Sequence, residues 1–219
     1  MGFVVKNTTN WSFLDLISPH TCRGCGQVGS VLCSCCKNNL KIGGLHEKPK
    51  YAIGFDKFLI CSKREGLIGE IIKEYKYNSV RDFGKILADF LLTMIEKEFE
   101  VGTTVIVPLP TIKKHIRARG FDHMEEVSRW IKKRDWRTQK VLRRINASVQ
   151  VGASAELRQK QARMAYGLKR GVKIEKEKNY LLIDDVCTTG ASLMAAAEVL
   201  RDNGAIKISV AVVAWSGKD

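Results

Sequence analysis

The chain has 219 residues, enough for one α/β domain of typical size with a smaller second part. Hydrophobic residues make up 45% of it, which supports a folded core, and no run of about 18 apolar residues exists to span a bilayer, so we expect no membrane insertion. The 37 basic residues exceed the 23 acidic ones, and the formal net charge of +14 favours polyanionic partners. The first residues lack a long apolar signal region, so we expect a cytoplasmic location.

Five of the seven cysteines lie between Cys22 and Cys36. They form two C-x-x-C pairs, Cys22/Cys25 and Cys33/Cys36, and four thiolates brought to one point are typical of a structural Zn²⁺ site. Cys35 is an alternative ligand to Cys33 or Cys36, although only the Cys33/Cys36 pair keeps the two-residue gap. A disulfide framework is the other alternative, and the odd number of cysteines disfavours it. We expect residues 1–50 to form a zinc-binding module and its link.

Residues 51–61 are predicted to form one or two strands. Apolar residues at helical spacing then predict one helix through residues 67–75 and a second through residues 83–95. Lys76 stands at the end of the first helix. A lysine there is either an ordinary surface residue or a cation that faces an anionic ligand.

The β-branched run 103–107 predicts a strand, which Pro108-Leu109-Pro110 ends. A basic stretch follows, from Lys113 to Arg119. Open α/β sheets bind ligands at the carboxyl ends of their strands, so this position indicates a phosphate site in which Arg119 makes forked contacts. The alternative is a solvated basic loop.

Three further segments follow before the C-terminal third of the chain. Residues 125–133 are expected to form a helix, and residues 141–144 a short edge strand. Residues 147–161 are polar and alanine-rich, which indicates a mobile loop. Such a loop is suited either to closing over a ligand or to following a nucleic-acid backbone.

An apolar run, Tyr180 to Ile183, predicts a buried parallel strand, and residues 192–203 have the apolar spacing of a helix. The turn between them carries Asp184, Asp185, Val186, Cys187, Thr188, Thr189, Gly190, Ala191 and Ser192. Two carboxylates at a strand end are suited to accept hydrogen bonds from vicinal ribose hydroxyls. The hydroxyls, the glycine and the positive end of the following helix are suited to hold a phosphate. The alternative is an ordinary strand-to-helix turn.

The segment from Tyr180 to Ser192 resembles the phosphoribosyl pyrophosphate (PRPP) signature of type I phosphoribosyltransferases. In that signature the acidic pair meets the ribose hydroxyls and the following loop holds the 5-phosphate. The resemblance favours a binding site over an ordinary turn. Asp184 and Asp185 are also the candidate catalytic residues, with Asp185 the candidate general base by its position.

Further motifs occur in one order over nearly the whole chain, and together they resemble the ComF family. They are the start Leu14-Asp15-Leu16-Ile17-Ser18-Pro19 before Cys22, the pair Lys76-Tyr77, the strand end Val107-Pro108-Leu109-Pro110, and Arg119-Gly120-Phe121. This chain has Asp122 and His123 where the family has Asn and Gln, which places an acidic group beside the pyrophosphate loop. The family's later Gln, Arg, Asn and Phe correspond to Gln150, Arg158, Gln161 and Tyr166.

The resemblance implies a type I phosphoribosyltransferase fold, an α/β architecture with a mostly parallel sheet flanked by helices, over residues 51–219. It implies Mg²⁺ with PRPP in the site and Lys76 and Arg119 near the pyrophosphate. It also implies a part in natural competence, with single-stranded DNA and the DNA-uptake helicase machinery as partners.

Two functions from different classes follow. The first is a PRPP-binding protein of DNA uptake and natural transformation that handles single-stranded DNA. The second is an active phosphoribosyltransferase of nucleotide metabolism that transfers ribose 5-phosphate from PRPP to an unknown acceptor. In that reaction a nucleophile displaces pyrophosphate from the ribose C1 atom, while Mg²⁺ and cationic side chains stabilise the leaving group.

Overall fold

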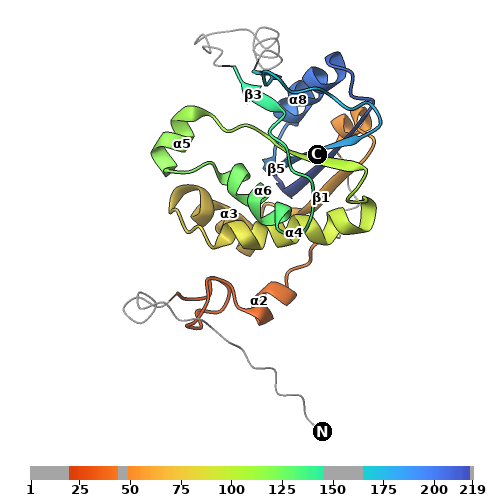
Figure 1. The fold of residues 1–219 in the computed structure, drawn as a ribbon. Coiled ribbons are helices and arrows are strands. Elements are labelled where there is room, and N and C mark those ends of the chain that lie inside the picture. The colour runs from red at the N-terminus through yellow and green to blue at the C-terminus, as the bar shows by residue number, and fades with distance from the viewer. Residues whose placement is uncertain (1–19, 44–48, 146–164, 218–219) are drawn as a thin grey trace. The chain divides into compact units, whose positions relative to one another are not determined.

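The computed structural model describes residues 20–43, 49–145 and 165–217 of the chain (Figure 1). The chain divides into two compact units, Met1–Leu40 and Lys41–Asp219. The expected division after residue 50, between a zinc-binding module and a phosphoribosyltransferase-like domain, stays a prediction. No described helix has both the length and the apolar character that a membrane crossing requires.

The first unit is built around its cysteines. An antiparallel bridge between Thr21 and Val28 closes the turn that holds the first cysteine pair. The helix α2, Ser34–Asn38, begins directly after Cys33, whose side chain caps it by accepting from the Cys36 N–H.

The second unit contains a four-stranded parallel sheet in the order β1-β6-β5-β2. The strands are β1 (Phe58–Lys63), β2 (Thr104–Pro108), β5 (Asn179–Cys187) and β6 (Lys207–Trp215). The central strands β5 and β6 are nearly continuous apolar runs, which is typical of a parallel sheet covered on both faces. The predicted mostly parallel sheet flanked by helices is confirmed.

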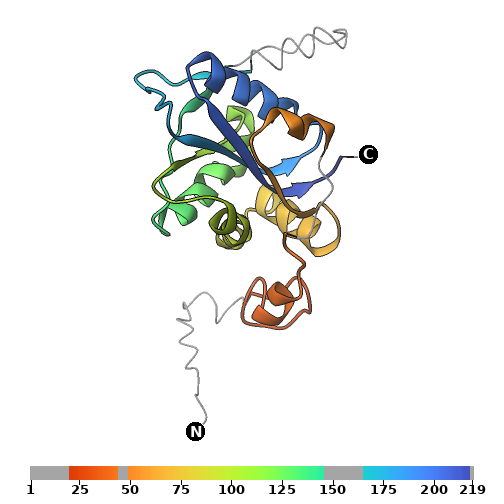
Figure 2. The same cartoon turned by 90° about the vertical axis from the view of Figure 1, so that its right-hand side faces the viewer.

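Helices cover both faces of this sheet, as Figures 1 and 2 show. They are α3 (Gly66–Tyr77), α4 (Phe83–Glu98), α6 (His123–Lys132) and α8 (Ala191–Asp202). Tyr180 and Leu182 of β5 share a core cluster with Leu193 and Leu200 of α8. Because side chains alternate along a strand, the intervening residues of β5 face the opposite side, where α4 and α6 pack.

Two predicted elements differ from the structure. Residues Lys50–Gly54 form a 3₁₀ helix, η1, so the first strand begins only at Phe58. The basic stretch, for which a solvated loop was only the alternative to a phosphate site, forms a helix, α5 (Lys113–Arg119), which ends at Gly120 with φ 81°. Lysine, arginine and alanine favour the helical conformation. The expectation considered the charge of the stretch and not this preference.

The predicted edge strand is present as β3 (Leu142–Arg144), but it does not extend the main sheet. It pairs antiparallel with β4 (Tyr166–Leu168) in a separate two-stranded sheet. The predicted mobile loop 147–161 lies outside the described residues, as do Gln150, Arg158, Gln161 and the start Leu14 to Pro19. The expectations for those residues stay predictions.

Candidate functional site

The acidic pair, Asp184 and Asp185, lies near the carboxyl end of β5, which continues through both residues to Cys187. Neighbouring side chains on a strand point to opposite faces, and the pair is divided accordingly. Asp185 is buried, with 3% of its side chain exposed, on the face that α6 covers. Asp184 is half-buried and lines a cavity at the carboxyl end of the strand.

Asp185 is held by two basic side chains from different helices. The Nζ atom of Lys76, at the end of α3, lies 2.7 Å from its Oδ2 atom. The Nε2 atom of His123, the first residue of α6, lies 3.0 Å from the same oxygen. The fold thus brings together three groups that are far apart in the sequence, and in this arrangement Lys76 neutralises Asp185.

A chain of polar contacts continues beyond His123. Thr111 Oγ1 donates to Asp122 Oδ1 at 2.9 Å and lies 3.2 Å from His123 Nδ1. Because the hydroxyl has one hydrogen, its oxygen is left to accept from Nδ1–H, while Nε2 faces the Asp185 carboxylate. Both ring nitrogens of His123 therefore face oxygen atoms, so the imidazole ring links Asp185 to Thr111.

The two neighbouring aspartates have opposite electrostatic environments. Burial and the charge of Asp185 raise the pKa of Asp184 well above its ordinary value. Burial alone would also raise the pKa of Asp185, but the contact with His123 and the charge of Lys76 lower it below its ordinary value. The surroundings therefore stabilise the ionised form of Asp185 and disfavour the ionised form of Asp184.

Arg119 lies at the end of α5 and reaches the neighbouring helix end. Its Nε atom donates to the backbone carbonyl of Lys76 at 2.6 Å. This hydrogen bond holds the backbone of Lys76 in place. The Nη1 atom of Arg119 is buried without a hydrogen-bond partner among the described residues. The predicted forked contacts to phosphate stay a prediction.

The loop after β5 forms the wall of the cavity that Asp184 lines. The cavity is lined by Asp184, Val186, Cys187, Thr188, Thr189, Gly190, Ala191, Ser192 and Leu193. Thr188, Thr189 and Ser192 are exposed, while Cys187 is buried, and burial raises the pKa of its thiol. Gly190 has φ 71° and directly precedes α8, so the loop leads into the N-terminus of a twelve-residue helix. This is the geometry of an anion site.

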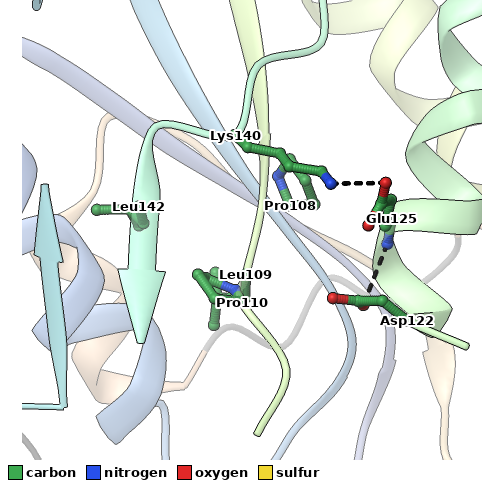
Figure 3. Close-up of a pocket in the computed structure, with 7 residues that line it drawn as sticks. All are labelled: Pro108, Leu109, Pro110, Asp122, Glu125, Lys140 and Leu142. Atoms are coloured by element: carbon green, nitrogen blue, oxygen red, sulfur yellow. Dashed lines mark hydrogen bonds and ion pairs between the residues drawn. The ribbon is translucent and has the colours of Figure 1, made fainter. Parts of the chain in front are cut away.

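A second cavity lies beside this site, at the end of β2 (Figure 3). It is lined by Pro108, Leu109, Pro110, Asp122, Glu125, Lys140 and Leu142. Lys140 is ion-paired with Glu125 at 2.6 Å, and Asp122 accepts from the Glu125 N–H as the N-cap of α6. Asp122, which departs from the ComF pattern, therefore has a structural role at the start of the helix that carries His123.

The structure groups most of the predicted site residues, and it adds others that the sequence analysis did not assign to the site. Lys76 and Asp185 are in direct contact, and Arg119 is linked to them through the Lys76 backbone. Thr111 and His123 complete the cluster. The sequence carried one signal for His123, its position directly after a capping aspartate at the start of a helix, but nothing indicated its partner.

The four predicted cysteine ligands lie together in the first unit. The Sγ atoms of Cys22, Cys25, Cys33 and Cys36 all lie within 4.8 Å of one another. Burial disfavours ionisation of Cys22, but N–H donors from Cys33, Cys25 and Gly24 lower its pKa to about 6. A hydrogen bond with the Cys33 side chain and burial raise the pKa of Cys36. Four sulfurs this close together fit a Zn²⁺ ion, which binds cysteines as thiolates.

A second group of possible metal ligands is His123, Asp184 and Asp185, whose ligand atoms also lie within 4.8 Å of one another. Asp185 is already paired with Lys76, which leaves Asp184 as the carboxylate with uncompensated charge. The donor chemistry of Asp184 suits Mg²⁺, which prefers oxygen ligands and is commonly held by one or two carboxylates together with substrate phosphates.

No protein-family model matches the chain, and one curated relative is consistent with the family resemblance. A DNA utilization protein, YhgH of Escherichia coli O6:H1, is 29% identical over 109 residues, which are 48% of this chain and 46% of that protein. The match thus spans about half of the length of the curated relative.

Two solved structures also resemble the chain. A hypoxanthine phosphoribosyltransferase from Staphylococcus aureus is 13% identical, with a TM-score of 0.36 over 60% of this chain and 62% of that one. The glutamine PRPP amidotransferase from B. subtilis is 19% identical, with a TM-score of 0.43 over 64% of this chain and 30% of that one. The match to the DNA utilization protein and the cluster of four cysteines are consistent with a ComF-family protein.

Proposed function

We propose that the chain binds PRPP with Mg²⁺ at the carboxyl end of β5 and serves DNA uptake and natural transformation in the cytoplasm, where it handles single-stranded DNA. One observation carries the proposal. Asp184, the loop from Cys187 to Ser192 and the start of α8 line one cavity, and the Lys76–Asp185 pair lies on the opposite face of the same strand.

Each part of the site has a distinct task in this proposal. The loop N–H groups and the hydroxyls of Thr188, Thr189 and Ser192 bind the 5-phosphate. Asp184 and Asp185 accept hydrogen bonds from the ribose hydroxyls, and His123 keeps Asp185 ionised and oriented. Lys76 and Arg119 offer cationic donors to the pyrophosphate. Mg²⁺ would supply charge neutralisation of that pyrophosphate.

The PRPP site can be tested by calorimetric titration of PRPP with Mg²⁺ into the full chain. The wild type and the Asp184→Asn/Asp185→Asn double variant are compared, and Asp202→Asn is the control because it makes the same change at an exposed position of α8. We expect saturable binding by the wild type and the control and none by the double variant. No binding by a folded, zinc-loaded wild type would reject the PRPP site.

The DNA partner is supported by the charge of the chain and by the name of the DNA utilization protein that it resembles. Phosphate contacts supply affinity that does not depend on base sequence and that falls with salt. The direct test is anisotropy of a labelled single-stranded oligonucleotide at several salt concentrations. The proposal extends to contact with the helicase machinery of uptake, which pull-down from a competent cell extract tests.

The second candidate is an active phosphoribosyltransferase that transfers ribose 5-phosphate to an acceptor. The feature that favours it is Lys76, whose ammonium group lies at the site's carboxylate. In the reaction this group would stabilise the leaving pyrophosphate. Pyrophosphate release, assayed with PRPP and a panel of nucleobases, distinguishes the two. Turnover above the buffer rate supports the enzyme, and binding without release supports the DNA-uptake protein.

A further inference from the structure

Tyr51, in η1, lies against the loop that the proposed function assigns to the 5-phosphate. Its hydroxyl donates to the backbone carbonyl of Thr188 at 3.0 Å and lies 3.0 Å from Cys187 Sγ. The ring is half-buried and packs edge-on against Phe58, with the ring centroids 5.9 Å apart. Tyr51 thus contacts and supports this loop, although it is far from the loop in the sequence.

The ring also fits closely against the other end of the loop. A Cβ atom at Gly190 would lie 2.4 Å from the ring of Tyr51, much closer than real side chains approach. Gly190 has φ 71°, a conformation that glycine adopts without strain. The loop and the ring are therefore fitted to one another at both Thr188 and Gly190.

The hydrogen bond to Thr188 determines the direction of the next N–H group. A trans peptide unit is planar, and its C=O and N–H bonds point in opposite directions. Because the Thr188 carbonyl points at Tyr51, the Thr189 N–H of the same peptide unit points away from Tyr51. That N–H has no hydrogen-bond acceptor in the part of the chain that the structure describes, so it is available to an anion.

We propose that Tyr51 is a positioning residue for phosphate recognition: its hydroxyl holds the Thr188–Thr189 peptide so that the Thr189 N–H faces the phosphomonoester of the ligand. This inference rests on the proposed PRPP site. It adds a residue that the signature segment does not contain, and it assigns that residue to one end of the ligand, the 5-phosphate, and not to the pyrophosphate.

The assignment to one end gives a selective test. Tyr51→Phe removes only the hydroxyl, and the affinities of the variant for PRPP, ribose 5-phosphate and inorganic pyrophosphate are measured by calorimetry. Loss of one orienting hydrogen bond is expected to weaken PRPP and ribose 5-phosphate about 3- to 10-fold. The affinity for pyrophosphate, which meets Lys76 and Arg119, is expected to stay within about 2-fold, the change usual for a substitution away from a binding site.

Tyr180→Phe is the matched control. The Tyr180 hydroxyl accepts from the Glu175 N–H at 2.8 Å, so its loss removes a tyrosine hydrogen bond that does not involve the loop. We expect the control to bind all three ligands as the wild type does. A purely structural role of Tyr51 would weaken pyrophosphate and ribose 5-phosphate together, and that result would overturn the inference.

The outcomes separate this inference from the proposed function. If the wild type binds ribose 5-phosphate and Tyr51→Phe binds it equally well, the role of Tyr51 is rejected and the PRPP site stands. If the wild type binds neither PRPP nor ribose 5-phosphate, the PRPP site is rejected, and the role of Tyr51 with it.

Discussion

Lys76 Nζ lies 2.7 Å from Asp185 Oδ2, so the cation expected near pyrophosphate is bound to the carboxylate expected near ribose. Both groups are largely buried, with 18% of the lysine side chain and 3% of the aspartate side chain exposed. A buried charge that loses its partner is costly, so the two residues depend on each other. His123 contacts the same oxygen, which leaves Asp185 with one basic partner when Lys76 turns to a ligand.

The opposite environments of the two aspartates predict opposite effects on stability. At pH 7, Asp184→Asn should raise the free energy of unfolding by about 0.5–2 kcal/mol, because it removes a charge that burial and Asp185 oppose. Asp185→Asn should lower it by about 3–5 kcal/mol, because it leaves Lys76 and His123 without their carboxylate. Urea unfolding of both variants measures the two effects, and a loss of stability in Asp184→Asn would contradict the first.

The same two shifts predict how these effects change with pH. The pKa of Asp184 is raised in the folded state, so the gain from Asp184→Asn is greatest at neutral pH and shrinks as the pH falls toward the unfolded value of about 3.9. The pKa of Asp185 is lowered, so its contribution is present above about pH 3.9 and is lost only below that value. We therefore expect that, between pH 7 and pH 4, Asp185→Asn keeps most of its loss in the free energy of unfolding. The gain from Asp184→Asn should decline over the same range, and unfolding measured at both pH values checks this.

His123 is expected to support Asp185 through its Nε2 atom. His123→Ala should lower the free energy of unfolding by about 1–3 kcal/mol, because a buried carboxylate loses a donor. His123→Gln, which restores an N–H donor, should lose less and should keep more PRPP affinity. His115→Ala is the control, since His115 is exposed on α5. Equal effects of the alanine substitutions at positions 115 and 123 would show that the contact contributes nothing.

The four-cysteine cluster predicts one bound Zn²⁺ per chain. Cys22→Ser and Cys36→Ser should each abolish the metal content measured by elemental analysis, because a structural site needs all four ligands. Cys35→Ser is the control, because Cys35 is exposed and not part of the cluster. Loss of zinc from Cys35→Ser with retention in Cys36→Ser would make Cys35 the ligand. Chelation should unfold the first unit and leave the unfolding transition of the second unit in place.

The basic helix α5 is expected to contact single-stranded DNA. Lys113, Lys114 and Arg117 are exposed and form no ion pair with a described residue. Their triple substitution by Gln should weaken binding of a labelled oligonucleotide and reduce the slope of log K against log salt by about 2, since each phosphate contact on a single strand contributes about 0.7.

The control for this experiment is Lys173→Gln/Lys176→Gln. These exposed lysines precede β5, at the amino edge of the sheet, whereas α5 follows the carboxyl end of β2. The control should bind DNA almost as the wild type does. Equal losses in both variants would indicate a general effect of net charge without a defined surface.

The elements with local signals could be predicted from the order of the residues. The apolar runs of β2 and β5, the helical spacing of α3, α4 and α8, and the C-x-x-C spacing each depend on residues that are close in the chain, so their pattern is legible without the fold. Asp184 and the loop to Ser192 were predicted as one site for the same reason, because strand, turn and helix are contiguous.

The contacts between groups far apart in the chain depend on the folded arrangement. Lys76 and Asp185 are joined because α3 ends where β5 ends, and His123 reaches the same oxygen because Asp122 starts α6 at that edge. The hydrogen bond from Tyr51 to Thr188 joins residues that are 137 positions apart in the chain. Such contacts depend on the packing of helices onto the sheet, and no spacing along the sequence records which side chains that packing brings together.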